Sequence, residues 1–474
     1  VWGLLPSFMT DCSDLPASLP LFAKRLGLTI EGEPSLRGPC CVALVSAIRS
    51  SKAALDDDAE MLGGGEDGEA PPATPRIGRE AGEANVSVLA QFAKNYLPIL
   101  FNVASQTPPA QRPPVMEAIE AYVSITDQAR VSSFFTNVMK KLLSATAGEG
   151  DAAMDTDEER EEKKALLLDL AIALMPGLDA PSTEFLYKAT VPLLRDDAGS
   201  VQKRVYKMMQ SMSVHQTGVV QARLGELCDS LVQALAECQP SASKWRLRCL
   251  HKLVELLPID GTYMRLLGSI LGEVMLGTKQ ASRKSRDVSF AMLVCMAQRI
   301  DASNSGRLQD LFSMVLAGLA GTTPHMMSAS VLALSRLVYE YSARVQDLAP
   351  QLLESVMLLL EHKSREIVTS ALGFAKVVSV SLPHDTLRVY LKPLVAALLL
   401  WSADSRNRFR LKVKVVLERL MRRLTYEEVL GATPAEHHKL IVAIHKKVKR
   451  AKSGRARKGG DGEFYDEAAG GDEQ

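Results

Sequence analysis

Histidines and paired carboxylates, the residues that most often carry chemistry, occur here without the partners that such chemistry needs. His437, His438 and His445 are the densest histidines, and the last two lie seven residues apart and so share one face of a helix. No thiol or carboxylate is placed to complete a zinc site with them. Glu117 and Glu120 can be imagined as paired acids, but they fit the solvated face of a helix better. We therefore expect exposed polar histidines, no metal and no catalytic residues.

Glycine-rich turns and thiols also lie in the wrong context for catalysis. The run Gly63-Gly64-Gly65 lies among carboxylates, which would repel a phosphate, and residues 268–272 miss the register of a Gly-x-Ser-x-Gly nucleophile turn. Cys249 and Cys295 fall at apolar helical positions and are interpreted as buried structural thiols in a reducing, intracellular compartment. The cysteines stand at positions 12, 40, 41, 228, 238, 249 and 295, with no Cys-x-x-Cys pair. The sequence thus predicts no enzymatic activity, no cofactor and no small-molecule substrate.

The composition favours one long repetitive array. The 474 residues are about three times a typical domain of roughly 150 residues, which leaves several domains or an array. Hydrophobic residues make up 47% but aromatic residues only 5%, so the expected core consists of Leu, Val, Ala and Met. The longest apolar run, residues 393–401, is far shorter than the roughly 20 residues that cross a bilayer, so no membrane partner is expected. The chain opens with Val1 and shows no secretion signal, and we interpret it as a piece of a longer protein.

Charges nearly balance in number but are strongly segregated along the chain. Lys and Arg total 56 and Asp and Glu 55, yet residues 406–458 contain 17 basic and 4 acidic residues, a net charge of +13. Carboxylates concentrate in residues 56–69 and 149–162, which are poor in large apolar side chains and are therefore predicted to be disordered. These acidic segments fit solvated linkers or a lure for basic partners. Thr156, followed by three carboxylates, is a candidate phosphorylation site for an acid-directed kinase.

Most of the remaining sequence has the apolar spacing of amphipathic helices, which predicts an all-α protein. One type of helix recurs, with a polar or basic start and an apolar middle. Its mid-helix residues, at successive spacings of 44, 40, 42, 40 and 41, are Tyr206, Leu250, Phe290, Leu332, Leu372 and Val413. A period in the low forties is typical of HEAT or armadillo repeats, in which antiparallel helix pairs stack into an α-solenoid. Any all-α protein yields some regular spacing, but six units in register favour the repeat.

The repeats and the acidic segments together predict six regions. They are N-terminal helical repeats at 1–53, a disordered acidic insert at 54–83, helical repeats at 84–147, an acidic linker at 148–162, a HEAT-like solenoid with basic C-terminal helices at 163–452, and a disordered basic-then-acidic tail at 453–474. Thr323, Thr425 and Thr433 are expected to cap helices. Basic residues at successive helix starts are expected to align into a ridge, and they include Arg204, Arg246, Arg286 and Arg365.

The basic end of the chain carries the strongest functional signal. In a helix over 404–424, six apolar residues share about 100° of arc and predict a buried stripe, while basic side chains crowd both flanks. The stripe consists of Phe409, Val413, Val416, Leu417, Leu420 and Leu424. Five like charges on one flank repel one another, so we expect an anion to relieve them, either an RNA backbone or an acidic protein. A second basic helix follows, and its inward residues are Leu440, Ile441, Ile444 and Val448.

We predict that these two helices contact RNA. The candidate residues are Arg406, Arg408, Arg410, Lys412, Lys414, Arg419, Arg422, Arg423, Lys446, Lys447, Lys449 and Arg450. A nuclear localisation signal is also predicted, from Lys446, Lys447, Lys449, Arg450, Lys452, Arg455, Arg457 and Lys458. Few aromatic residues are interleaved, so binding is expected to depend on phosphates and salt and to read bases weakly. A merely solvated basic end is the alternative.

Several strings of sequence are more specific than these patterns. The chain resembles the ribosomal RNA processing protein 12 family at WGLLP (2–6), FAKNYLPILFN (92–102), VQKRVY (201–206), SALGF (370–374) and RFRLK (408–412). The resemblance covers nearly the whole chain. It implies a HEAT-repeat nucleolar scaffold without enzymatic activity, which joins early small-subunit pre-ribosomes, helps pre-rRNA maturation and accompanies subunits toward nuclear export. Members of the family are much longer, so the chain resembles a central-to-C-terminal portion, and its two acidic inserts are longer than the family pattern requires.

Two functions that use a solenoid remain open. In the first, a pre-ribosome scaffold binds pre-rRNA and assembly factors in the nucleolus and nucleus, and shuttles to the cytoplasm with the nuclear transport machinery as a further partner. In the second, a karyopherin-like transport receptor or a general protein-interaction solenoid binds cargo. Import of cargo normally needs an acidic concave surface, whereas the recurring helix starts here are basic. The sequence therefore favours the scaffold.

Overall fold

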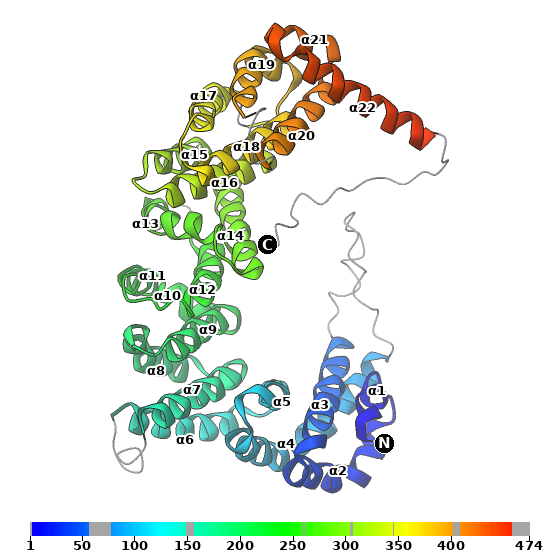
Figure 1. Ribbon diagram of the computed structural model, residues 1–474. Helices are drawn as coiled ribbons and strands as arrows, with labels where there is room; N and C mark the ends of the chain where they lie inside the picture. Colours follow the sequence, from blue (N-terminus) through cyan, green and yellow to red (C-terminus); the bar gives the residue numbers. More distant parts are fainter. Residues whose placement is uncertain are drawn as a thin grey trace. The chain divides into compact units, whose positions relative to one another are not determined.

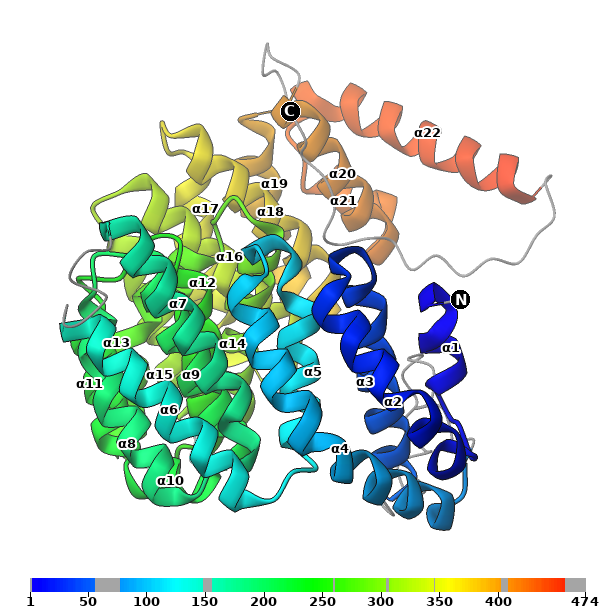
Figure 2. The ribbon, with the colours of Figure 1, turned by 90° about the horizontal axis from the view of Figure 1, so that it is seen from below.

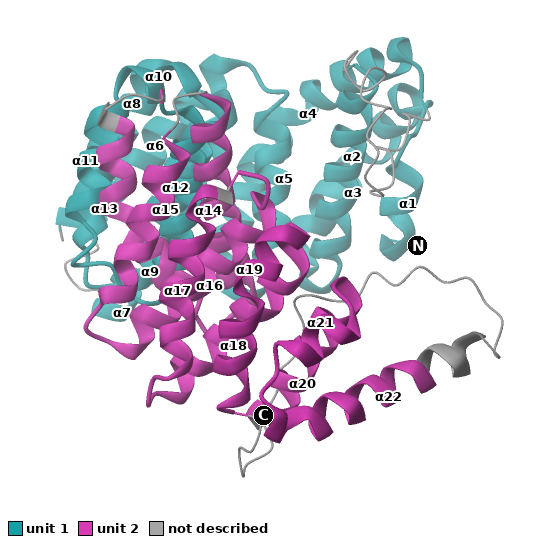
Figure 3. Ribbon diagram, turned by 90° about the horizontal axis from the view of Figure 1, so that it is seen from above, with its two compact units in different colours: residues 1–257 teal, residues 258–474 magenta. Residues whose placement is uncertain are grey.

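The structure is a computed structural model (Figure 1), and it describes residues 2–55, 77–147, 156–258, 261–303, 307–344, 346–401 and 408–456. Helices account for most of these residues, and no strand occurs among them. None of the described helices combines the length and the apolar character that a bilayer span requires. The chain divides into two compact units, Val1–Leu257 and Pro258–Gln474 (Figure 3).

Unit 1 begins with a group of closely packed helices, seen in blue and cyan in Figure 2. They are η1 Trp2–Leu4, α1 Leu5–Met9, α2 Leu15–Gly32, α3 Pro34–Ala53, α4 Arg79–Gln106, η3 Pro109–Gln111 and α5 Pro113–Val123. Helix α3 packs against α1, α4 and α5, and α2 packs against α4. Two buried polar contacts support the packing: Tyr96 Oη donates to Ala23 O over 2.8 Å, and Arg37 Nη1 donates to Thr107 Oγ1 over 3.0 Å. Each contact ties one helix to the next, because a buried polar group must find a partner.

The rest of unit 1 continues as stacked helices. They are α6 Gln128–Ala147, α7 Asp157–Leu174, η5 Met175–Gly177, α8 Ala180–Thr190, η6 Val191–Arg195, α9 Gly199–His215, α10 Thr217–Ala222, α11 Leu224–Gln233 and α12 Ser243–Leu256. Helices α5, α7, α9 and α12 are neighbours in this order (Figure 1). Each therefore covers the apolar face of the helix before it, which is how HEAT-type repeats build a continuous core.

Unit 2 repeats this arrangement. Its elements are α13 Gly261–Gly277, α14 Arg283–Ala302, α15 Leu308–Ala317, η7 Gly318–Ala320, α16 Pro324–Glu340, η8 Gln346–Leu348, α17 Ala349–Leu360, α18 Arg365–Ser381, α19 His384–Leu399, α20 Arg408–Arg423, α21 Tyr426–Gly431, η9 Ala435–His437 and α22 His438–Ala456. Helices α14, α16, α18, α20 and α22 follow one another as neighbours, and α13, α15, α17 and α19 pack beside them. Both units are thus stacks of helix pairs.

The six mid-helix residues that set the predicted period fall on six different helices. Tyr206 lies on α9, Leu250 on α12, Leu372 on α18 and Val413 on α20, and each is at most 1% exposed. Phe290 on α14 and Leu332 on α16 are half-buried. The predicted all-α, HEAT-like α-solenoid of stacked helix pairs is confirmed.

The acidic linker expected at 148–162 is in part a helix, and the prediction is wrong from Asp157 onward. Helix α7 begins there, and Thr156 forms a capping box with Glu159, in which each side chain bonds the other residue's backbone N–H. The carboxylates of Asp157, Glu158 and Glu159 lie in the first turn, where the helix dipole favours negative charge. The same acids that suggested disorder therefore stabilise the start of the helix, while residues 148–155 lie outside the described part.

Two other helices also extend into regions that were expected to be disordered. Helix α4 begins at Arg79, inside the insert expected at 54–83, and α22 continues to Ala456, beyond the expected end at 452. The division after Leu257 falls inside the expected single solenoid of 163–452. The predictions of disorder for 56–76 and 457–474 concern residues outside the described part.

Two of the three expected threonine caps form. Thr323 accepts from the Met326 N–H over 3.2 Å, and Thr425 forms a capping box with Glu428. Thr433 does not cap: its hydroxyl donates to Val429 O over 2.7 Å, as the last turn of the preceding helix offers an acceptor.

A buried glutamine fixes α9 to the turn before α12. The side chain of Gln202 is fully buried, and its amide nitrogen donates to Asp196 O over 2.9 Å and to Glu237 O over 2.8 Å. Its amide oxygen accepts from the Gln239 N–H over 2.8 Å. Three backbone groups in two loops thus depend on one side chain.

We expect Gln202→Leu to lower the free energy of unfolding by about 2–4 kcal/mol, because it leaves three backbone groups, bonded in part-buried positions, without their side-chain partner. Urea denaturation followed by helical circular dichroism measures the change. Gln210→Leu, at a half-buried position on the same helix, is the matched control and should cost less than about 1 kcal/mol. Equal losses in the two variants would contradict the role given to Gln202.

Candidate nucleic-acid interface

The apolar stripe predicted for the first basic helix is the buried face of α20. All six stripe residues are at most 7% exposed: Phe409, Val413, Val416, Leu417, Leu420 and Leu424. The face packs against α18, α19 and α22. Burying this stripe fixes the rotation of α20 about its axis and so decides which way its arginines and lysines point.

An aromatic contact holds the beginning of α20. The rings of Trp401 and Phe409 meet edge to face with centroids 5.1 Å apart, and Trp401 Nε1 donates to Leu360 O over 2.6 Å. The Arg365 guanidinium carbon lies 5.6 Å from the Phe409 centroid. Arg365, expected to contribute to a basic ridge, therefore also packs on an aromatic ring.

The predicted RNA-binding residues divide by exposure. Those exposed are Arg410, Arg422, Lys446, Lys447, Lys449 and Arg450, and those half-buried are Lys412, Lys414, Arg419 and Arg423. Arg406 lies outside the described residues, and the side chain of Arg408 is not described. Four of the six exposed cations lie on α22.

Two of the arginines on α20 have partners within the protein. Arg423 Nη2 donates to Leu382 O over 2.7 Å, which satisfies a carbonyl just after the end of α18. Arg422 forms an ion pair with Glu418 one turn earlier, at 2.5 Å. The flank for which the sequence predicts five unrelieved like charges is therefore partly neutralised by Glu418 of the same helix. Packing brings only the Leu382 carbonyl near.

Helix α22 presents its lysines outward. Ile441 and Ile444 are buried, and Leu440 and Val448 are half-buried, as the predicted inward face requires. The rings of Tyr426 and His445 lie 4.2 Å apart and join α21 to α22. Of the predicted localisation signal, the side chains of Lys452 and Arg455 are not described, and Arg457 and Lys458 lie outside the described residues.

The three histidines of this region have separate partners. His437 Nε2 lies 3.4 Å from the Glu436 carboxylate, His438 Nε2 lies 2.9 Å from Thr433 O, and His445 stacks on Tyr426. Each is half-buried, so the expectation that they are exposed is wrong. They support turns and helix contacts.

The expected ridge of basic helix starts is wrong at three of its members. Arg204 Nε pairs with Asp169 at 2.8 Å, and Arg286 Nη1 donates to the carbonyls of Gln280 and Ala281. Arg246 is fully buried, where its Nη1 donates to Leu231 O over 2.6 Å. Because repeat junctions leave helix ends to be satisfied, arginines at these starts serve the fold.

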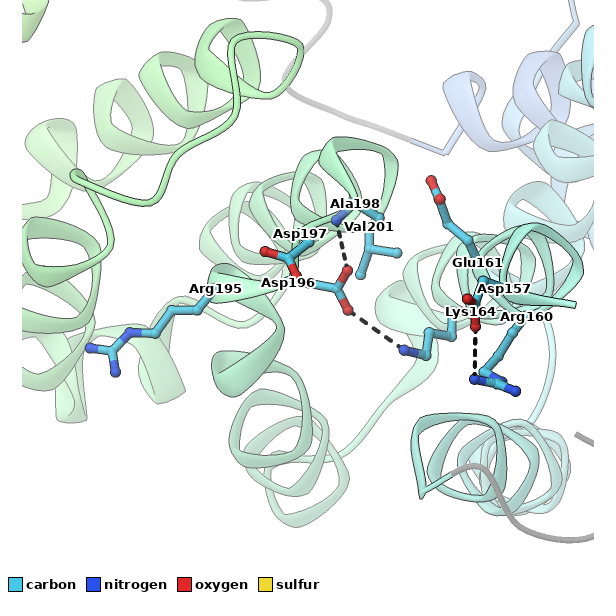
Figure 4. A pocket seen from close by; sticks show the side chains of 9 residues that line it. All are labelled: Asp157, Arg160, Glu161, Lys164, Arg195, Asp196, Asp197, Ala198 and Val201. Carbon is cyan, nitrogen blue, oxygen red and sulfur yellow. Dashed lines mark hydrogen bonds and ion pairs between the residues drawn. The ribbon is translucent and has the colours of Figure 1, made fainter. Parts of the chain in front are cut away.

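A cleft of about 580 Å³ lies in unit 1 between α7 and the start of α9 (Figure 4). Its lining residues are Asp157, Arg160, Glu161, Lys164, Arg195, Asp196, Asp197, Ala198 and Val201. Lys164 pairs with Asp196 at 3.6 Å and Arg160 with Asp157 at 3.2 Å, while Arg195 points away from them. With acids and bases paired to each other, the cleft fits an internal ion-pair network better than a charged ligand.

Burial keeps several of the thiols protonated. Cys249 is fully buried, as predicted, and burial raises its pKa to about 12. Burial likewise raises the pKa of Cys41 to about 12 and those of Cys40 and Cys228 to about 11. Since the thiolate is the reactive form, these thiols are inert at neutral pH. Cys295 is only half-buried, contrary to expectation.

The fold defines a class: a HEAT-type α-solenoid. Among solved structures, the karyopherin Kap121p superposes with a TM-score of 0.52 at 12% identity, over 91% of this chain and 44% of Kap121p. Kap121p bound to the SUMO protease Ulp1p gives a TM-score of 0.53 at 12% identity, over 91% of this chain and 43% of that one. At this identity the likeness concerns the fold alone.

Comparison of sequences narrows the class to one family. The family model described as "Ribosomal RNA-processing protein 12, HEAT repeats" matches residues 1–107. Ribosomal RNA-processing protein 12 of Saccharomyces cerevisiae is 28% identical over 95% of this chain and 38% of its own length. RRP12-like protein of Homo sapiens is 31% identical over 96% of this chain and 33% of its own length. The chain belongs to the ribosomal RNA-processing protein 12 family and spans about a third of the length of these relatives.

We expect the combined change of Lys446, Lys447 and Lys449 to Glu to weaken binding to single-stranded RNA. If the wild-type interface engages about six phosphates, the slope of log affinity against log salt is about −4 to −5, and losing three contacts reduces its magnitude by about 2. Fluorescence anisotropy over a salt series measures both slopes. The control changes three exposed lysines of α4 and α6, Lys94, Lys140 and Lys141, to Glu, with the same change in net charge. An equal effect of both sets would show that net charge alone governs binding.

Arg423 and its neighbour Arg422 are expected to differ in how much they contribute to the stability of the protein. We expect Arg423→Ala to lower the free energy of unfolding by about 1.5–3 kcal/mol, because Leu382 O loses a charged donor. Arg422→Ala should cost at most about 0.5 kcal/mol, because its ion pair is largely exposed. Chemical denaturation of both variants tests the difference, and a reversed order would contradict it.

Proposed function

We propose that this chain is part of a non-enzymatic scaffold of small-subunit pre-ribosomes, which binds pre-rRNA and assembly factors during rRNA processing, maturation and nuclear export. The observation that carries the proposal is identity along almost the whole chain to relatives named for ribosomal RNA processing. The match includes both units, so the proposal concerns the chain as a whole and not one domain of it.

The structure supplies a physical basis for RNA contact. In unit 2, stacked helix pairs offer a surface on which Lys446, Lys447 and Lys449 of α22 are exposed. Lysines on a helix bind phosphates as point charges and carry little base specificity. Such a surface suits a scaffold that holds RNA of many sequences during assembly.

The proposal places the protein in the nucleolus and nucleus, with shuttling to the cytoplasm alongside subunits. Lys446, Lys447 and Lys449 are exposed, as a nuclear localisation signal must be to reach its receptor. The same residues would serve import before RNA is bound and RNA contact afterwards. Contact with the nuclear transport machinery is part of this proposal.

A transport receptor is the second candidate, because the solved structures with this fold include Kap121p bound to RanGTP, with a TM-score of 0.51. That likeness comes with 12% identity and reflects a shared way of stacking helices. The relatives with 28–31% identity carry an rRNA-processing name, so we favour the scaffold.

Gradient sedimentation of the tagged full-length protein from cells tests the proposal. Each fraction is probed for the protein and for small-subunit pre-rRNA, with and without ribonuclease. We expect co-sedimentation that ribonuclease abolishes, since RNA is the proposed support of the complex. Sedimentation as a free or cargo-sized species, unchanged by ribonuclease, would contradict the scaffold and favour the transport receptor.

A further inference from the structure

Trp245, near the start of α12, is surrounded by cations from two helices of unit 1. From α9, Lys207 Nζ lies 4.5 Å and Lys203 Nζ 5.7 Å from the centroid of its ring. From α12 itself, Lys244 Nζ lies at 5.6 Å and the Arg248 guanidinium carbon at 4.8 Å. Four positive groups thus lie within cation–π range of one indole.

The packing of α9 against α12 creates this Trp245 cluster, which we define as Trp245 with its four cations. Lys203 and Lys207 lie one turn apart on α9, and Lys244 and Arg248 lie one turn apart on α12, so each helix presents a pair of cations on one face. The two helices are direct neighbours (Figure 1). Trp245 is half-buried, so part of the indole remains accessible to a ligand.

The core beneath the cluster holds it in place. Tyr206 and Arg246 are fully buried between the helices, with the Arg246 guanidinium carbon 5.9 Å from the Tyr206 centroid. Arg246 also donates to Leu231 O on α11, and Gln202 bonds the loop residues that precede α9 and α12. The cations therefore lie on a rigid support, which lowers the entropy cost of binding a ligand.

Three of the four cations in the cluster have no ion pair of their own among the described residues. In the part of the chain that the structure describes, Lys203, Lys207 and Arg248 have no carboxylate within ion-pair distance, and the nearby Asp169 is engaged by Arg204 at 2.8 Å. Burial is the largest cause of the lowered pKa of Lys207; the Asp169 carboxylate, the next largest influence, raises that pKa, and the charges of Lys203, Arg204 and Arg248 lower it. Bound anionic groups would relieve the repulsion among Lys203, Lys207 and Arg248 further than the nearby Asp169 does.

We propose that the Trp245 cluster is a contact site for single-stranded RNA, with phosphates on the lysines and a base stacked on the accessible indole or the Arg248 guanidinium. The proposal rests on the proposed function and adds a second site, on a different unit from α20 and α22. Aromatic rings and guanidinium planes are the surfaces on which unpaired bases stack. An acidic peptide would use the charges and leave the ring without a role, so we favour RNA.

The site would give the protein a selectivity that the lysines of α22 lack. Bases in a duplex are stacked on each other and hide their faces, whereas unpaired bases are free to stack on a side chain. The cluster should therefore prefer single-stranded RNA, while the lysines of α22 bind phosphates of either form.

Binding of a labelled oligouridine of roughly 12 nucleotides, and of a duplex of equal length, tests the proposal on the whole chain. We expect Trp245→Leu and the pair Lys207→Gln with Arg248→Gln each to weaken oligouridine binding about tenfold. Trp245→Phe, which keeps an aromatic ring, should stay within about twofold of wild type, and Trp245→Leu should change duplex binding less than about threefold. Phe185→Leu is the control, since Phe185 is a 47% exposed aromatic residue on α8 of the same unit.

Some results would overturn the site. Oligouridine binding that is indifferent to Trp245→Leu would do so, as would competition by poly-glutamate as strong as that by oligouridine at equal charge. The latter result would assign the cluster to an acidic protein instead.

Crosslinking of the unaltered chain to 4-thiouridine-containing RNA avoids any dependence on the folding of variants. We expect crosslinked peptides that contain residues 203–207 or 244–248. Crosslinks confined to α20 and α22 would remove this site and leave the proposed function intact. No crosslink, together with sedimentation apart from pre-ribosomes, would remove both.

Discussion

An amphipathic helix pair leaves an apolar face that only the next pair can cover, and the rest of this protein depends on that constraint. In unit 1, α7 packs on α5, α9 on α7 and α12 on α9. In unit 2, α16 packs on α14, and α18, α20 and α22 follow in the same way. Each step must return the chain to an equivalent position, so the mid-helix residues recur about every forty residues.

Stacking in this way leaves backbone groups at helix ends that must be satisfied at the junctions between helices. Long polar side chains perform this role at several junctions. Gln202 bonds backbone groups of two loops, Arg246 donates to Leu231 O, and Arg423 donates to Leu382 O. Some of the arginines thus stabilise the fold. Fewer positive charges are therefore available at the surface to bind a partner than the number of basic residues in the sequence suggests.

The basic side chains that remain at the surface form two different kinds of site. The lysines of α22 are exposed point charges on a helix whose apolar side is buried, and this arrangement is suited to phosphates. At the Trp245 cluster, cations from two helices converge on one half-buried aromatic ring over a rigid core. Together the two surfaces suit a scaffold that holds RNA without transforming it, in keeping with the rRNA-processing names of the relatives.

The sequence by itself determined the helical class, the repeat period, the buried stripe of α20 and the family, because apolar spacing and short local strings are properties of neighbouring residues. It misjudged residues 157–162, where a local capping box outweighs a composition typical of disorder. Only the tertiary structure decided which arginines serve the fold and which cations gather around Trp245. The partner of Arg423, and two of the four cations around Trp245, lie about forty residues away along the chain, one repeat distant. No pattern within a single helix can show which side chains that packing brings together.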